Sequence, residues 1–265
     1  MIRVAAAGDL HVGPDSARAV GDQLRNVADR ADLLLVAGDL TKSGRAEEAA
    51  ALAGELRGLG VQAVAVLGNH DHHADRPQEI AELLREVGVV VLEGDGVRID
   101  TEAGSVGVAG VKGFGGGFSG ASGAEFGEPE MKAFIRHTKE RAEALEAALT
   151  DLDTDVRIAL MHYAPIRETL QGEPPEIFPF LGSYLLAEAV DRAGADLVVH
   201  GHAHRGTEHG VTPGGVSVRN VAQTVIRQAY AVYAFEQIGS RREAAAIGAD
   251  ADGRGIAPTG PSADG

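Results

Sequence analysis

The chain has 265 residues, and its 24 lysines and arginines against 39 aspartates and glutamates give a formal charge of −15. It contains no cysteine, which excludes disulfides, cysteine nucleophiles and thiolate-ligated metal centres. The negative charge argues against long nucleic acids and anionic membranes as partners, because neutralising their phosphates needs a basic surface. No segment has the ~18 uncharged apolar residues of a membrane helix, and Asp9 interrupts the apolar run at the start of the chain before it could form a secretory signal. We therefore expect a cytoplasmic protein with a small substrate, and the sequence leaves its oligomeric state open.

The first half of the chain alternates β-rich runs with amphipathic helical patterns. Strands are predicted over 2–7, 32–37 and 61–67, and helices over 16–30, 45–59 and 79–87. This order predicts parallel strands with right-handed crossovers. In such sheets, ligand-binding groups gather at the carboxyl ends of the strands.

The second half has a different pattern. Closely spaced strands at 89–92, 97–100 and 105–111 predict a hairpin or meander. The aperiodic Gly/Ser/Phe segment 113–127 is interpreted either as a flexible surface insertion or as a lid over a site. A helix at 128–149, a strand at 155–161, a helix at 182–193 and strands at 196–200, 216–222 and 229–235 follow. We predict one domain over 1–238, with an insertion and helix at 113–149, and a disordered tail over 239–265, which has almost no large apolar residues.

Polar residues follow five of the predicted strands. They are Asp9 and His11, then Asp39, then Asn69, then His162, and finally His202 and His204. Residues i and i+2 of an extended chain face the same side, so Asp9 and His11 can share a cation. Asp, Asn and His side chains suit Mn²⁺, Fe, Zn²⁺ or Ni²⁺. Seven candidate ligands exceed the needs of one tetrahedral ion but suit two ions that share a carboxylate.

These residues form an ordered set of motifs: Asp9-x-His11, Gly38-Asp39, Gly68-Asn69-His70-Asp71, His162 and Gly201-His202-x-His204. In order and spacing the set resembles the five motifs of the calcineurin-like metallophosphoesterase superfamily, over residues 4–204. The resemblance implies an α/β fold, specifically a four-layer α/β/β/α sandwich.

The resemblance also implies roles for individual residues. Asp9, His11 and His204 would hold a first divalent metal ion, Asn69, His162 and His202 would hold a second, and Asp39 would bridge both. His70 would lie beside the substrate phosphate as a charge stabiliser or as the acid for the leaving oxygen. The implied reaction is hydrolysis of a small phosphodiester, which could be a cyclic nucleotide, by in-line attack of a metal-bridging hydroxide.

One departure from the superfamily pattern indicates which branch of the superfamily the chain resembles. The protein Ser/Thr phosphatases continue the second motif as Gly-Asp-x-x-Asp-Arg-Gly, whereas residues 38–44 here lack the Asp-Arg pair, and Asp71 replaces their Glu. The pattern looks more like the bacterial phosphodiesterase branch. A phosphomonoesterase, a nuclease of the same superfamily and a non-catalytic metal-binding scaffold remain as alternatives.

Other polar residues near the motifs have more ordinary interpretations. We interpret His72 and His73 as solvated, and His137 and His209 as exposed. His200 is interpreted as a satisfied strand histidine or as a partner of a ligand. Asp71 is interpreted either as a residue that orients its neighbours or as the N-cap of the helix that follows. The chain that follows the fourth motif contains candidates to line a substrate pocket, namely Tyr163, Arg167 and Glu168.

Overall fold

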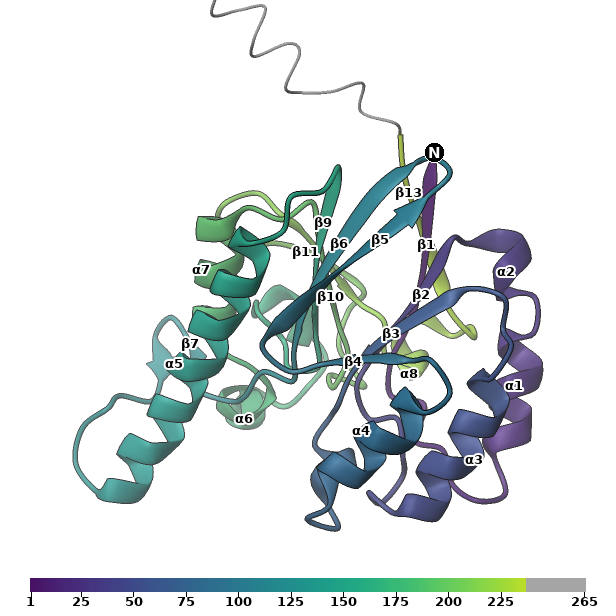
Figure 1. Ribbon diagram of the computed structural model, residues 1–265. Helices are drawn as coiled ribbons and strands as arrows, with labels where there is room; N and C mark the ends of the chain where they lie inside the picture. The colour runs from purple at the N-terminus through teal and green to yellow at the C-terminus, as the bar shows by residue number, and fades with distance from the viewer. Residues whose placement is uncertain (237–265) are drawn as a thin grey trace, which may run out of the picture.

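The computed structural model describes residues 1–236, and the tail expected at 239–265 lies outside the described residues. Two β-sheets pack face to face, and helices cover the outer face of each sheet (Figure 1). The predicted four-layer α/β/β/α sandwich is therefore confirmed.

The first sheet has the strand order β13-β1-β2-β3-β4. Its strands are β1 (Ile2–Ala7), β2 (Leu33–Ala37), β3 (Gln62–Val66), β4 (Val90–Leu92) and β13 (Ala231–Phe235). Strands β1 to β4 are parallel, and β13 runs antiparallel to β1. The prediction that the strand at 89–92 belongs to a meander is wrong, because the chain reaches β4 through a helical crossover and Val90 pairs with Val64 in parallel.

Four helices pack on the outer face of this sheet: α1 (Ala17–Leu24), α2 (Val27–Arg30), α3 (Ala46–Leu56) and α4 (Pro77–Arg85). Their apolar stripes, among them Leu24, Leu52 and Leu84, are buried against the sheet. The single helix predicted over 16–30 is wrong: two helices form, and Asn26 takes the N-cap position of the second. The side chain of Asn26 makes no capping hydrogen bond, but its φ of −101° and ψ of 18° lie outside the helical region and interrupt the helix there.

The second sheet has the order β11-β12-β10-β9-β6-β5. It consists of β5 (Asp95–Thr101), β6 (Gly104–Val111), β9 (Val156–Met161), β10 (Leu197–His200), β11 (His209–Val211) and β12 (Ser217–Asn220). Strands β5 and β6 form the predicted hairpin, whereas β6, β9, β10 and β12 are parallel. Helices α5 (Pro129–Thr150) and α7 (Tyr184–Ala193) cover its outer face. The short edge strand β11 is missing from the sequence prediction.

The two inner faces share one apolar core. Leu33, Leu35 and Val64 of the first sheet meet Val108 and Ile158 of the second, and all five are fully buried. This contact fixes the sheets so that the carboxyl ends of β1, β2, β3, β9 and β10 lie near one another, as the interactions described below show. The loops that follow these strand ends therefore build a common site.

The remaining elements are short. They are β7 (Gly117–Phe118), β8 (Ala121–Ser122), α6 (Phe178–Leu181), α8 (Gln223–Ile226) and the 3₁₀ helices η1 (His70–His72), η2 (Glu168–Leu170) and η3 (Pro175–Ile177). The segment 113–127 is tied to the α6 region, because the amides of Gly116 and Gly117 donate to the carbonyls of Pro179 and Gly182. Within residues 1–236, no helix combines the length and apolar character needed to cross a bilayer.

Candidate metal centre

Four of the predicted ligands converge in one cluster. Asp9, His11, Asp39 and His204 each present a ligand atom, and these atoms all lie within 4.8 Å of one another. His204 Nε2 is 2.9 Å from Asp9 Oδ1, and the Nε2 atoms of His11 and His204 are 3.3 Å apart. A cation between these atoms would be shared by two imidazole nitrogens and two carboxylates, which are donors that borderline divalent metals accept.

Asp39 also belongs to a second cluster, with His162 and His202. His162 Nδ1 donates to the Ala37 carbonyl at 2.9 Å, which leaves its Nε2 as an acceptor in the neutral ring. That Nε2 lies 2.9 Å from Asn69 Oδ1 and 3.3 Å from Asp39 Oδ1. Three acceptor atoms thus face one another, and a metal cation would satisfy all of them. The donor set therefore fits a bound divalent ion.

The backbone is strained at the same residues. Asp9, His11, Asp39 and His202 have positive φ angles of 57°, 44°, 49° and 71°. Among the non-glycine residues that the structure describes, only Asp75 and Arg227 share this property. Left-handed conformations of this kind cost about 1–3 kcal/mol each and gather at functional sites. Four of the seven predicted ligands are therefore held in backbone conformations that reduce the stability of the fold.

Glycines before the ligands permit close approach of the loops. A Cβ at Gly68 would lie 2.1 Å from Asp39 Oδ1, and one at Gly201 would lie 2.3 Å from Asp9 Oδ2. Any side chain at these two positions would displace a predicted carboxylate ligand. The glycine of each of these two motifs therefore has a steric role in the site.

Asp71 ties two of the motif loops together. Its buried carboxylate accepts hydrogen bonds from the amides of Leu40, Thr41 and Gly68 and from the Thr41 hydroxyl. Burial raises the pKa of this carboxyl despite these bonds. The interpretation of Asp71 as the cap of the next helix is wrong, because Arg76 is the N-cap residue of α4. The bonds of Asp71 go to backbone amides and to Thr41 instead, and they fix the loop that carries Asp39.

Burial and charge set the protonation of the clustered histidines. Burial lowers the pKa of His202 to about 3, and it also lowers the pKa of His11. The hydrogen bond to Asp9 raises the pKa of His204. For Asp9, burial acts to raise the pKa, but the hydrogen bond from His204 and nearby imidazole charge produce a net lowering. Neutral imidazoles and ionised carboxylates are the forms that bind metals.

His70 lies beside the clusters without joining either. Its Nδ1 is 2.7 Å from the Lys42 carbonyl, and its Nε2 is 3.9 Å from Asp39 Oδ2. Its side chain is 42% exposed, so that a ligand in the site can reach the ring. Its backbone amide donates to Asp39 Oδ1 at 2.8 Å.

A family model described as calcineurin-like phosphoesterase matches residues 2–206. The chain belongs to the calcineurin-like phosphoesterase family. No curated protein sequence gives a significant match.

Solved structures with this fold are distant in sequence from this calcineurin-like phosphoesterase. The phosphopantetheinyl hydrolase of Mycobacterium tuberculosis is 18% identical with a TM-score of 0.62, covering 90% of this chain and 96% of that one. TT1561 of Thermus thermophilus is 19% identical with a TM-score of 0.56, covering 84% and 90%. GAP50, described as the anchor in the inner membrane complex of Plasmodium, is 11% identical with a TM-score of 0.50, covering 84% and 72%. These likenesses support the fold.

The other histidines of this calcineurin-like phosphoesterase differ from their sequence interpretation in two cases. His200 is fully buried between the Gly201 carbonyl and the Thr169 hydroxyl, which agrees with a satisfied strand histidine. His72 is half-buried instead of solvated, and burial together with the charge of Lys112 lowers its pKa to about 4. His137 is half-buried instead of exposed, because its ring packs edge-on against Phe114.

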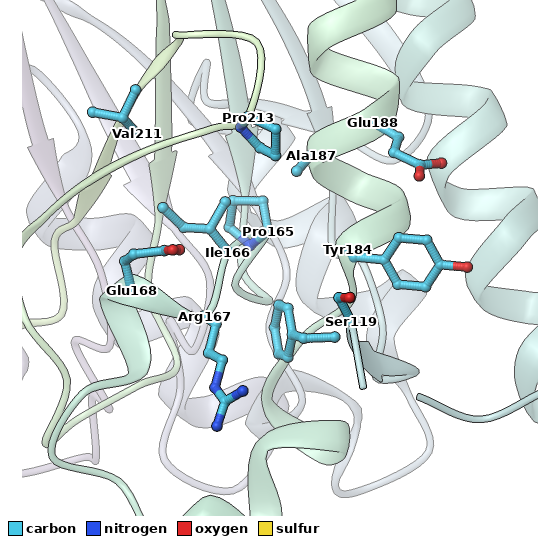
Figure 2. Close-up of a pocket in the computed structure, with 11 residues that line it drawn as sticks. Ser119, Pro165, Ile166, Arg167, Glu168, Tyr184, Ala187, Glu188, Val211 and Pro213 are labelled. Carbon is cyan, nitrogen blue, oxygen red and sulfur yellow. The ribbon is translucent and has the colours of Figure 1, made fainter. Parts of the chain in front are cut away.

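Residues beyond the fourth motif lie in two different places. Arg167 and Glu168 line a pocket of about 470 Å³ between the loop after β9, helix α7 and the turn after β11 (Figure 2). None of the eight predicted site residues lines this pocket. Tyr163 instead packs its ring 4.4 Å from the ring of His202, centroid to centroid. Of the three candidates, Tyr163 is therefore the one that borders the metal-ligand clusters.

Sequence reasoning missed Lys112, which follows β6 at the same edge of the sheet. Its backbone carbonyl accepts from the amides of His162 and Tyr163, both at 3.1 Å. A charged residue directly after the buried run 106–111 is a signal of the same kind as the five motifs, and it could have been found in that way.

Proposed function

We propose that this protein is a dinuclear metal-dependent phosphoesterase that hydrolyses small phosphodiesters. One observation carries the proposal: two clusters of metal-ligand side chains share the carboxylate of Asp39. Asp9, His11 and His204 would hold one divalent ion with Asp39, and Asn69, His162 and His202 would hold the other. Mn²⁺, Fe, Zn²⁺ and Ni²⁺ all accept this donor set.

When bound, such a pair of ions supplies positive charge that holds a phosphate and lowers the pKa of water. The protein's own groups account for the rest of the site. Asp9 and Asp39 carry the negative charge that retains the ions, and Asn69 adds a neutral oxygen. The Lys42 carbonyl holds His70 by its Nδ1, so that the ring presents Nε2 toward the substrate. From there it can donate a proton to the leaving oxygen or stabilise the charge that develops on it.

The choice of a small diester as substrate follows from the motifs and the charge. Residues 38–44 lack the Asp-Arg pair of protein phosphatases, and Thr41 is instead bound by Asp71. A formal charge of −15 disfavours long polyanions. The substrate is therefore expected to be held by the metal site and its immediate surroundings.

Metal-dependent hydrolysis tests the proposal. The protein is stripped with a chelator, reloaded with Mn²⁺, and assayed on p-nitrophenyl phosphate, bis(p-nitrophenyl) phosphate and 2′,3′- and 3′,5′-cyclic nucleotides, with metal content measured by mass spectrometry. We expect about two metal ions per chain, hydrolysis only after reloading, and a preference for diesters.

Asp39→Ala should lose metal and hydrolysis together, because it removes the ligand that both clusters share. The matched control is Asp100→Ala, which removes an exposed carboxylate paired with Arg98 and should change neither. Full metal content without turnover on any ester would favour a non-catalytic scaffold, and faster monoester than diester hydrolysis would favour a phosphomonoesterase. An active Asp39→Ala variant with both metals would refute the shared carboxylate.

A further inference from the structure

Lys112 lies at the end of β6, next to the strand end that carries His162. Its carbonyl accepts the His162 and Tyr163 amides, so that its backbone is fixed relative to the second ligand cluster. Its side chain extends over aromatic rings, with Nζ 5.0 Å from the centroid of Phe114 and 5.3 Å from that of Tyr163. Because the Tyr163 ring also contacts the ring of His202, the ammonium is one aromatic ring away from a predicted metal ligand.

This ammonium has little compensation for its burial. Lys112 is only 8% exposed, and within residues 1–236 its Nζ forms neither an ion pair with a carboxylate nor a hydrogen bond. Glu93 and Asp39 are the acidic groups whose charge acts on it, but the Glu93 carboxylate is engaged by the Lys112 backbone amide at 3.1 Å and by Arg141 at 3.1 Å, and Asp39 belongs to the ligand clusters. Cation–π contacts stabilise an ammonium by ~0.5–2 kcal/mol. This is less than the several kcal/mol that it costs to remove a cation from water.

The surroundings favour an anion as the missing partner. His72 and His137 are both half-buried, and burial together with the charge of Lys112 lowers the pKa of both imidazoles. Two divalent ions on the neighbouring clusters would add further repulsion to the ammonium. An anionic group that reaches Lys112 would relieve both effects, and Nζ would give it a charge-assisted hydrogen bond.

We propose that Lys112 binds a second phosphate of the substrate, so that the enzyme prefers phosphoesters that carry a further phosphate beside the one that is cleaved. This inference rests on the proposed function for the position of the first phosphate. It makes Lys112 a specificity-determining residue, with Phe114 and Tyr163 as the walls that hold its side chain in place.

AMP and ADP are the probes, because they differ by one phosphate. Their dissociation constants are measured by calorimetry on the manganese-loaded protein, with Mn²⁺ in excess over nucleotide. We expect the wild type to bind ADP more tightly than AMP, and Lys112→Met to reduce this preference by about tenfold, the value of one charge-assisted hydrogen bond. Lys112→Arg should retain part of the preference, since the cation is kept. Thermal melting establishes that each variant is folded.

The matched control is Lys139→Met, which removes a lysine on α5 that pairs with Glu125 at the surface. It should keep both the ADP preference and the hydrolysis of bis(p-nitrophenyl) phosphate. Equal losses of AMP and ADP affinity in Lys112→Met, or no loss, would overturn the inference and indicate a purely structural lysine. Failure of the wild type to hydrolyse any ester would instead contradict the proposed function, while the ratio of nucleotide affinities would still test Lys112.

Discussion

His70 contacts the shared carboxylate through its backbone amide, and its ring packs edge-on against that of His11 at 4.5 Å between centroids without belonging to either ligand cluster. Replacement of the ring should therefore affect turnover more than metal binding. We predict that His70→Ala keeps its metal content and lowers kcat by about 10²–10⁴-fold, the usual contribution of a general acid. Stopped assays on bis(p-nitrophenyl) phosphate and metal analysis of the same samples measure the two effects.

The neighbouring His73 provides a control for His70. It is exposed and lies three residues further along the chain, so His73→Ala should behave as the wild type. A smaller defect on substrates with good leaving groups than on those with poor ones would fit proton donation to the leaving oxygen. An unchanged kcat in His70→Ala would refute the role assigned to this ring.

At the scale of elements, the loops after β2 and β3 are packed so closely that a single methyl group should disrupt the site. Gly68→Ala would place a Cβ 2.1 Å from Asp39 Oδ1, so the carboxylate or its loop must move. We predict that this variant binds less metal and loses most activity while remaining folded, since the contact is local.

Gly54→Ala is the matched substitution in a helix. A Cβ at Gly54 meets no atom within 4 Å, and alanine at this position in the last turn of α3 should raise the free energy of unfolding by up to about 1 kcal/mol. Denaturant unfolding and metal analysis of both variants separate the two effects. Normal metal content in Gly68→Ala would mean that Asp39 does not need its present position.

The sequence predicted elements well where a periodic pattern and a terminating residue coincide. The strand that ends before Gly8 and the long helix ending at Thr150 have bounds close to the predicted ones. It failed for β4 because three apolar residues carry no information on which sheet they join. It also missed β11, in which His209 and Val211 are exposed at a sheet edge and the three residues show no apolar alternation.

At the scale of the whole molecule, chain order alone could not tell which strand ends meet across the two sheets. The grouping of ligands around Asp39 came from the resemblance to a family, and the contacts described here bring the same residues together. The contacts of Lys112 depend on the packing of β6 against β9. Those of Asp71 depend on the packing of its own loop against the loop that carries Thr41. Such long-range contacts leave no periodic trace in the sequence, so the sequence can single out these two positions but not the groups that they contact.

Packing also determines how the stability of the metal-free protein depends on pH. Full burial lowers the pKa of His200 to about 4 in the folded state, whereas an unfolded histidine has a pKa of about 6.5. Between these values the unfolded chain binds the extra proton, so acid favours unfolding. The contribution of His200 is therefore complete above about pH 6.5 and is lost as the pH falls toward about 4. We predict that His200 alone accounts for a loss of about 2 kcal/mol between pH 7 and pH 5.

The variant His200→Gln isolates this contribution, because glutamine retains hydrogen-bonding groups for Gly201 and Thr169 but does not titrate. Urea unfolding of both proteins in the presence of a chelator at pH 7, 6 and 5 gives the free energy of unfolding at each pH. The variant should be less stable than the wild type at pH 7, since glutamine fits the site imperfectly. The difference in the free energy of unfolding between the two proteins should become about 2 kcal/mol smaller at pH 5. All other titrating groups are common to the two proteins and cancel in the comparison. A gap that stays constant from pH 7 to pH 5 would show that His200 gains its proton as readily in the folded protein as in the unfolded chain.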